Sequence, residues 1–173
     1  MNFSNKDGGK IIFELIKTIQ DKKDFLSEVD GKIGDGDHGI NMNKGFTMTY
    51  CKVNGKDYDM TTAFSVLGDT LLEDIGGSMG PLYGAFFDGL SEVSEDHDTI
   101  DEKTFQEMIH SALEAIQDIG NAKRGDKTLL DTLIPAVEAY DAALEAGKNF
   151  NEALSELKSA AETGWKSTED MVA

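Results

Sequence analysis

Apolar residues recur at helical spacing along almost the whole chain. Near the N-terminus, for example, Ile11, Ile12, Leu15, Ile16 and Ile19 fall on one face of a helix. Stretches of this kind are separated by short polar or glycine-containing segments, with only two prolines and few runs of β-branched residues, which favours helices over strands. The pattern predicts helices at residues 9–22, 38–53, about 59–75, about 80–94, 101–119, 127–146 and from 151 onward, with a short helical turn at 25–29.

The expected fold is all-α. About seven antiparallel amphipathic helices joined by short loops predict an up-and-down bundle that closes into a barrel. A chain of 173 residues is most simply one domain, residues 1–173. Pro135 lies inside a predicted helix and is expected to kink or break it, and Asn151 is expected to cap the last helix.

The core can also be anticipated from the periodicity. We expect Phe25 and Val29 to pack inward from their helical turn, and Ile40 and Leu72 to lie on the inner faces of their helices.

The segment Asp30-Gly-Lys-Ile-Gly-Asp-Gly-Asp-His-Gly-Ile-Asn41 carries the most chemistry. Asp30, Asp35 and Asp37 alternate with glycines directly before a predicted helix, so the backbone can bend tightly and direct several oxygens at one point. Oxygen ligands of this kind suit Mg²⁺, which is usually held by a few carboxylates together with substrate phosphates. The start of the following helix offers unpaired N–H groups and partial positive charge to an anion.

Simpler interpretations exist for this segment. Asp and Gly are both common in solvated turns. An EF-hand is excluded by spacing, because a loop that begins at Asp35 would place Gly39 at its fifth position and Phe46 where the bidentate glutamate is required. His38 could cap the helix, hydrogen-bond a ligand, or have a purely structural role.

Two further loops contain glycines near a helix start. Residues 76–81 (Gly-Gly-Ser-Met-Gly-Pro) could bind phosphate or could simply connect two helices, with Pro81 in the first turn of the second helix. Residues 120–128 (Gly-Asn-Ala-Lys-Arg-Gly-Asp-Lys-Thr) are locally basic and could equally be a solvated loop.

Charge and cysteine content exclude several classes of function. The net charge of −17 disfavours binding to nucleic acid or to an anionic membrane surface. An acidic protein that binds a polyphosphate must also bind cations, which agrees with a metal at the Asp-rich segment. The single Cys51 cannot form an internal disulfide, and no stretch has the length of a signal peptide core or a membrane span, so a cytoplasmic protein is expected.

The chain resembles DhaL, the ADP-binding subunit family of dihydroxyacetone kinases. The resemblance rests on residues 30–41, 76–84 and 125–131, which occur in the order and at the spacing of that family, although Met79 stands where the family usually has serine. It implies an eight-helix barrel with a nucleotide site at one rim, and two Mg²⁺ ions that bridge the phosphates of ADP or ATP. The residues implied are Asp30, Asp35 and Asp37 for metal, His38, Gly39, Ile40, Asn41, Ser78 and Met79 for the phosphates, and Gly120 and Leu129 for the adenosine part.

The resemblance also implies partners. A DhaM-like phosphohistidine protein would phosphorylate the bound ADP, and the phosphate would pass to dihydroxyacetone held on a DhaK-like subunit. Alternatives are a subunit of an ATP-dependent kinase for another small sugar, a nucleotide-sensing module that binds a transcription regulator, or a divalent-binding helical protein without nucleotide. The family continues into a further segment and a closing helix beyond the position of Ala173, so we expect this sequence to be a short form of the domain.

Overall fold

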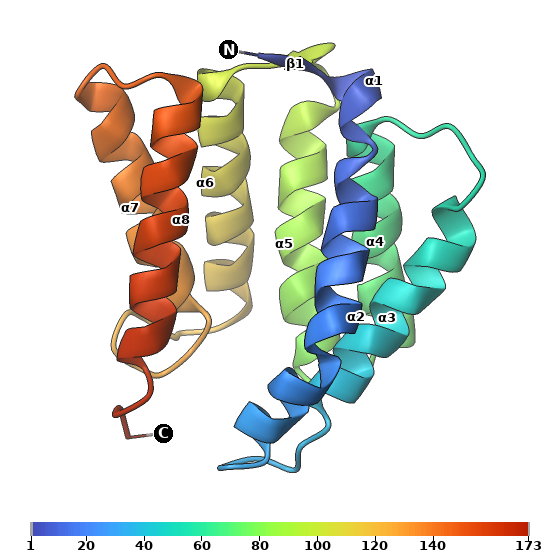
Figure 1. The fold of residues 1–173 in the computed structure, drawn as a ribbon, viewed down its shortest axis with the longest axis vertical. Coiled ribbons are helices and arrows are strands. Elements are labelled where there is room, and N and C mark those ends of the chain that lie inside the picture. Colours follow the sequence, from blue (N-terminus) through green and yellow to red (C-terminus); the bar gives the residue numbers. More distant parts are fainter. Residues whose placement is uncertain (1, 173) are drawn as a thin grey trace.

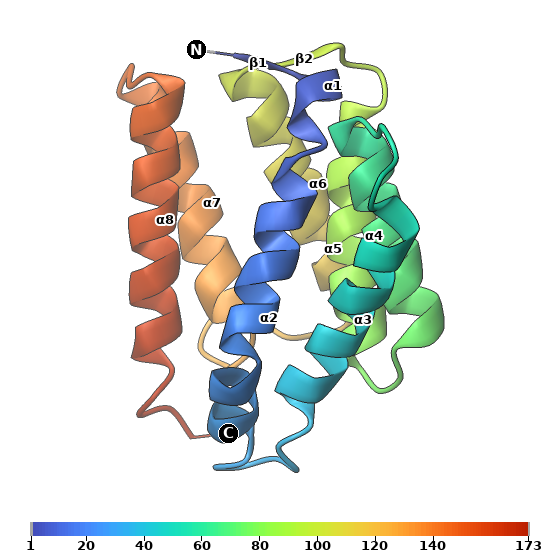
Figure 2. The same ribbon diagram turned by 45° about the vertical axis from the view of Figure 1, so that its right-hand side comes forward.

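Helices make up most of the computed structural model, which describes residues 2–172 (Figure 1). The long helices are α2 (Ile11–Asp30), α3 (His38–Val53), α4 (Met60–Asp74), α5 (Met79–Ser94), α6 (Glu102–Ile119), α7 (Leu130–Glu145) and α8 (Phe150–Ser167). A short helix α1 (Asn5–Gly8) and an antiparallel ribbon of β1 (Phe3–Ser4) and β2 (Thr99–Ile100) were not predicted. They cover one end of the helices (Figures 1 and 2).

The predicted all-α, up-and-down architecture is confirmed. Each long helix packs against the next one in the sequence, so that α2 to α8 follow one another around the molecule. The first and last of them approach each other where the rings of Phe25 and Trp165 meet edge to face, with centroids 6.1 Å apart. Within residues 2–172, every helix is too short or too polar to cross a lipid bilayer.

All seven long helices contribute to one hydrophobic core. Leu67, Leu71 and Tyr140 are fully buried in it, and the Tyr140 hydroxyl donates to the Glu102 carbonyl at 2.9 Å. Burial without water is tolerated here because the one polar atom of the ring has a partner.

Four predictions about local structure were wrong. No break separates residues 9–22 from 25–29, because the sequence between them contains no helix breaker and α2 runs on to Asp30. The last helix is capped by Asn149 rather than Asn151, through a capping box with Glu152. Helix α7 continues through Pro135 without a break and begins at Leu130, three residues after the predicted start.

The other error concerns the core. Ile40 and Leu72 are 55% and 51% exposed, and Phe25 and Val29 are 44% and 39% exposed. Periodicity identified helical faces correctly, but it could not show which faces have a neighbouring helix to cover them. These side chains lie where the ring of helices leaves them partly uncovered.

Candidate functional site

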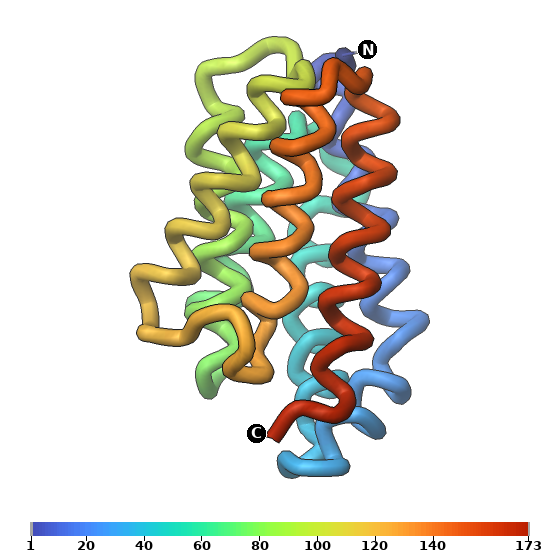
Figure 3. Tube along the Cα trace, turned by 90° about the vertical axis from the view of Figure 1, so that its left-hand side faces the viewer, coloured from blue at the N-terminus to red at the C-terminus, as the bar shows by residue number. Residues whose placement is uncertain are grey.

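The three glycine-containing loops lie at the same end of the molecule, opposite β1 and β2 (Figures 1 and 2). They connect α2 to α3, α4 to α5, and α6 to α7. In an up-and-down bundle, alternate connections are at the same end, so motifs separated by whole helical hairpins can share one rim. The loop between α2 and α3 projects furthest, as the view in Figure 3 shows.

Three carboxylates come together in that projecting loop. One oxygen from each of Asp30, Asp35 and Asp37 lies within 4.8 Å of the others. Asp30 ends α2, whereas Asp37 directly precedes α3. The carboxylates are only partly buried, and Asp35 and Asp37 are exposed, so their oxygens are accessible to a hydrated cation.

Hydrogen bonds give the loop its shape. The Asp30 carboxylate accepts from the His38 N–H at 3.3 Å, and the Asp35 carboxylate accepts from the Asp37 N–H at 3.3 Å. The Asn41 side-chain amide donates to the Asp37 carboxylate at 2.7 Å. Oxygens on all three acids remain available beyond these bonds, since each carboxylate has about four acceptor sites.

The start of α3 also presents free donors. Its N-cap residue Asp37 makes no side-chain cap, and the N–H groups of His38 and Asn41 are already bonded to Asp30 and to the Asp37 carbonyl. This leaves the N–H groups of Gly39 and Ile40 without a hydrogen-bond partner in the described part of the chain. Of the four residues expected at the phosphates, the middle two therefore have the donors to offer.

The start of α5 has a similar arrangement. Ser78 is exposed and its hydroxyl does not cap the helix, while Pro81 has no N–H group. The N–H groups of Met79 and Gly80 are therefore the open donors of the first turn. The Met79 side chain packs against the hydrophobic core, so this residue presents only its backbone at the surface.

A contact between rings joins these two helix starts. His38 and Tyr83 meet at a centroid distance of 6.0 Å, and burial raises the pKa of the Tyr83 hydroxyl. Gly80 and Tyr83 were missed as site residues. The sequence did contain a signal for Gly80, because the residue before Pro81 lies in the first turn whose N–H groups are unpaired.

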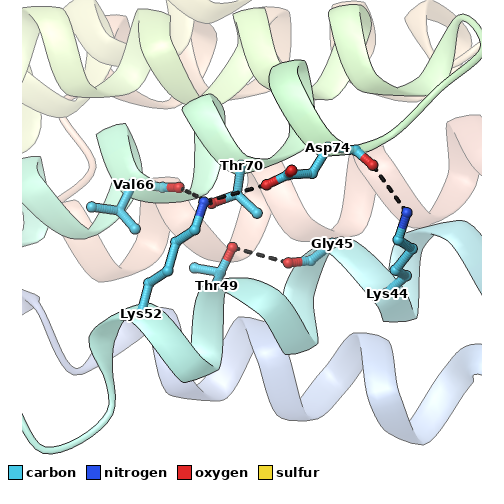
Figure 4. A network of polar contacts seen from close by, with 7 residues as sticks. All are labelled: Lys44, Gly45, Thr49, Lys52, Val66, Thr70 and Asp74. Atoms are coloured by element: carbon cyan, nitrogen blue, oxygen red, sulfur yellow. Dashed lines mark hydrogen bonds and ion pairs between the residues drawn. The ribbon is translucent and has the colours of Figure 1, made fainter.

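Helix α3 is held in place against α4 by a polar network on their shared face (Figure 4). The Lys52 ammonium donates to the Thr70 hydroxyl at 2.9 Å and pairs with the Asp74 carboxylate at 3.4 Å. Lys44 donates to the Asp74 carbonyl at 3.1 Å, at the end of α4 where a cation is favourable. These bonds fix the position of α3 along α4, and with it the position of the α3 N-terminus at the rim.

Helix α3 also approaches α2 closely at its start. A Cβ atom at Gly39 would lie 1.9 Å from the Lys23 carbonyl oxygen and 2.7 Å from the Ser27 hydroxyl oxygen. The Ser27 hydroxyl is buried without a hydrogen-bond partner among the described residues. Glycine at position 39 is thus required for the two helices to bring Asp30 and Asp37 together.

The third loop has a different character. Gly120 is exposed and Leu129 is partly buried, and neither has a described contact with the Asp30, Asp35 and Asp37 cluster. The Arg124 guanidinium donates to Glu138 at 2.9 Å, so its charge is paired outside the rim cluster. The structure brings this loop to the same end of the molecule without placing it against the carboxylates.

The donor set fits Mg²⁺ and a phosphate group. Three converging carboxylates are hard oxygen ligands, and two uncapped helix starts next to them supply N–H groups to an anion. No histidine or thiol takes part in the cluster, so a softer transition metal has no preferred ligand here.

Comparison with known proteins agrees with this geometry. The profile of the DAK2 domain matches residues 32–173. The chain belongs to the DAK2 domain family. The resemblance to DhaL subunits found in the sequence is thereby confirmed.

Named relatives of this DAK2 domain include ADP-binding subunits. It is 38% identical over 122 residues to the PEP-dependent dihydroxyacetone kinase 1, ADP-binding subunit DhaL, of Listeria innocua, a match that covers 70% of this chain and 61% of the relative. It is 32% identical over 153 residues to the PEP-dependent dihydroxyacetone kinase, ADP-binding subunit DhaL, of Escherichia coli, covering 88% of this chain and 73% of the relative.

A solved structure supports the fold of the domain. The dihydroxyacetone kinase from C. freundii, crystallised in complex with AMP-PNP and Mg²⁺, superposes with a TM-score of 0.75. The match covers all of this chain and 30% of the kinase chain, at 23% sequence identity. At that level of identity the similarity establishes the helical fold and nothing about ligands.

Proposed function

We propose that this DAK2 domain is the nucleotide-binding subunit of a dihydroxyacetone kinase. In this role it binds ADP or ATP with two Mg²⁺ ions at the rim and passes a phosphoryl group to dihydroxyacetone on a partner subunit. The observation that carries the proposal is the convergence of Asp30, Asp35 and Asp37 beside the uncapped start of α3. The family membership and the named DhaL relatives support the same function.

Each group at the rim then has a defined task. The three carboxylates hold the metal, and the N–H groups of Gly39 and Ile40 donate to phosphate oxygens. The N–H groups of Met79 and Gly80 do the same from α5. When bound, the metal supplies charge neutralisation to the phosphates, and little covalent chemistry is required of the protein.

The remaining expected residues take supporting positions. His38 and Asn41 shape the loop through their bonds with Asp30 and Asp37, and the exposed Ser78 hydroxyl is free to donate to a phosphate. Gly120 and Leu129 are proposed to border the adenosine part from the third loop. No side chain at the rim is proposed as a nucleophile, which is consistent with transfer through positioning and electrostatics.

Partners follow from the chemistry. A DhaK-like subunit would present dihydroxyacetone, and a DhaM-like phosphohistidine protein would restore the phosphate on ADP. The acceptor is chosen by the partner, so another small sugar is the alternative substrate, and a transcription regulator is an alternative partner. A cytoplasmic location stays a prediction.

Thermal unfolding tests the binding half of the proposal. A ligand present at 100 times its dissociation constant stabilises the folded state by about 2.7 kcal/mol. With an unfolding entropy of about 2.1 cal/mol/K per residue over 173 residues, the melting temperature should rise by about 7 °C. We expect this rise with Mg²⁺ and ADP together and a much smaller one with either alone.

Asp35→Asn is the informative variant. Asp35 is exposed and its one described bond, from the Asp37 N–H, can be kept by an amide oxygen, so the unliganded protein should retain its stability. The joint rise with Mg²⁺ and ADP should disappear. Asp96→Asn removes the same charge from an exposed turn at the other end of the chain's α5 helix and should leave the rise intact.

Two results would contradict the proposal. Equal stabilisation by Mg²⁺ with and without ADP would reduce the site to a divalent-cation loop. An undiminished rise in Asp35→Asn would show that the carboxylates do not hold the metal. A positive result leads to the transfer assay, in which the chain is combined with DhaK-like and DhaM-like subunits and phosphorylated dihydroxyacetone is measured.

A further inference from the structure

Asp131 is a buried carboxylate that the proposed chemistry does not use. It lies in the first turn of α7 and is 3% exposed. Its two oxygens accept the N–H groups of Gly125 at 2.5 Å and Thr128 at 2.9 Å. Both donors precede the helix, so Asp131 does not serve as a cap for the first turn of α7 itself.

The loop that Asp131 organises has an unusual backbone. Gly125 has a φ of 100° and Lys127 a φ of 56°, the latter being the one non-glycine residue in the left-handed region among residues 2–172. A conformation of this kind is unfavourable for a side-chain-bearing residue and persists where surrounding contacts determine it. The N–H groups of Thr128, then Gly125 and then Lys127 all lower the pKa of Asp131, which shows that they converge on its charge.

The same loop is tied to the C-terminal end of α8. The Lys127 ammonium donates to the carbonyls of Met171 at 2.6 Å and Glu169 at 3.4 Å. Helix α8 also presses on the start of α7, since a Cβ atom at Gly164 would lie 2.2 Å from the Asp131 carbonyl oxygen. The next residue, Trp165, contacts Phe25 on α2, the helix that ends in Asp30.

We propose that Asp131 is a positioning residue for nucleotide binding, which holds loop 120–129 in the shape that receives the adenosine part. The inference rests on the proposed function. Asp131 does not touch the nucleotide. Its negative charge gathers the backbone between Gly125 and Thr128, and this fixes the rim on the side away from the carboxylate cluster. The phosphate side of the site is built by α3 and α5 and does not depend on it.

This division of labour gives a test with two probes. Mg–ADP needs both sides of the rim, whereas Mg–pyrophosphate needs only the phosphate side. For Asp131→Asn we expect the dissociation constant of Mg–ADP to rise by about tenfold or more, the loss of one charge-assisted hydrogen bond. The dissociation constant of Mg–pyrophosphate should stay within about twofold of the unmodified protein.

Asp126→Asn is the matched control. Asp126 lies in the same loop and accepts the Lys123 N–H at 2.9 Å, but its carboxylate is exposed. It should bind both probes as the unmodified protein does. Both ligands are measured by isothermal titration calorimetry on the full chain at a temperature where circular dichroism shows it folded. If Asp131→Asn does not fold, Asp131→Glu keeps the charge, displaces it by one methylene group, and is subject to the same comparison.

The outcomes are distinct. A selective loss of Mg–ADP binding supports the inference. Unchanged Mg–ADP binding, or an equal loss of both probes, overturns it and leaves Asp131 as a residue needed only for stability. Failure of the unmodified chain to bind Mg–ADP at all would instead count against the proposed function.

Discussion

Replacing Gly39 by alanine is expected to separate α2 from α3 at the point where the carboxylate cluster forms. The added Cβ would lie 1.9 Å from the Lys23 carbonyl oxygen, whereas an ordinary contact begins at 3.4 Å. The difference, 3.4 − 1.9 = 1.5 Å, must be met by moving one helix, because a carbonyl oxygen inside α2 cannot rotate away.

The size of the effect follows from this displacement. Inserting a methyl group into a tightly packed contact reduces the free energy of unfolding by about 1 to 3 kcal/mol. For 173 residues this corresponds to a fall in melting temperature of about 3 to 8 °C. Since Asp30 and Asp37 lie on the two helices that separate, the affinity for Mg–ADP should fall by about 10- to 100-fold, as for loss of other supporting contacts at metal sites.

Urea denaturation and calorimetric titration with Mg–ADP measure the two effects. Gly76→Ala is the control, because a Cβ there meets nothing within 4 Å and the residue has an ordinary φ. It should change stability by less than about 0.5 kcal/mol and leave affinity unaltered. If Gly39→Ala matched the control in both measurements, the close approach of the helices would have no role in forming the site.

Three further predictions concern stability. Asn149→Ala removes the capping box of α8 and should lower the free energy of unfolding by about 1 kcal/mol in urea denaturation; an unchanged midpoint would refute it. The N–H of Thr104 lowers the pKa of Asp101 below its unfolded value, so the stabilisation is present above about pH 4 and is lost as the pH falls through the folded pKa. Asp101→Asn should therefore flatten the decline of stability between about pH 5 and 3, and an unaltered profile would contradict this. Trp165→Ala removes the ring contact with Phe25 and should destabilise by about 1 to 2 kcal/mol, less than a fully buried aromatic, because Trp165 is 45% exposed; a loss above about 4 kcal/mol would show that it acts as a core residue.

Local sequence was informative where strong signals coincide. Helix α3 begins at His38 and ends at Val53 as predicted, because a glycine-rich segment stops the preceding structure and the periodicity starts at once. Asp59 and Asp101 cap the helices that they precede, accepting from Thr62 and Thr104. Such features depend on neighbours within four residues, which the sequence displays directly.

Sequence was misleading where the outcome depends on distant neighbours. Leu72 fits the inner stripe of its helix by spacing, yet it is half exposed, because no other helix covers that part of α4. Met79 raised the question of a lost hydroxyl, which the fold answers by packing its side chain on the core and leaving its N–H at the surface.

The sequence by itself determined the helical class, the carboxylate-rich loop and the family, because periodicity, ligand type and motif spacing are local properties of the chain. Only the tertiary structure decided which N–H groups at the two helix starts remain free, that Gly39 permits the close approach of α2 and α3, and that Asp131 gathers the loop before α7. These depend on contacts between residues far apart in the chain or on the exact course of the backbone. They exist only once the helices have packed.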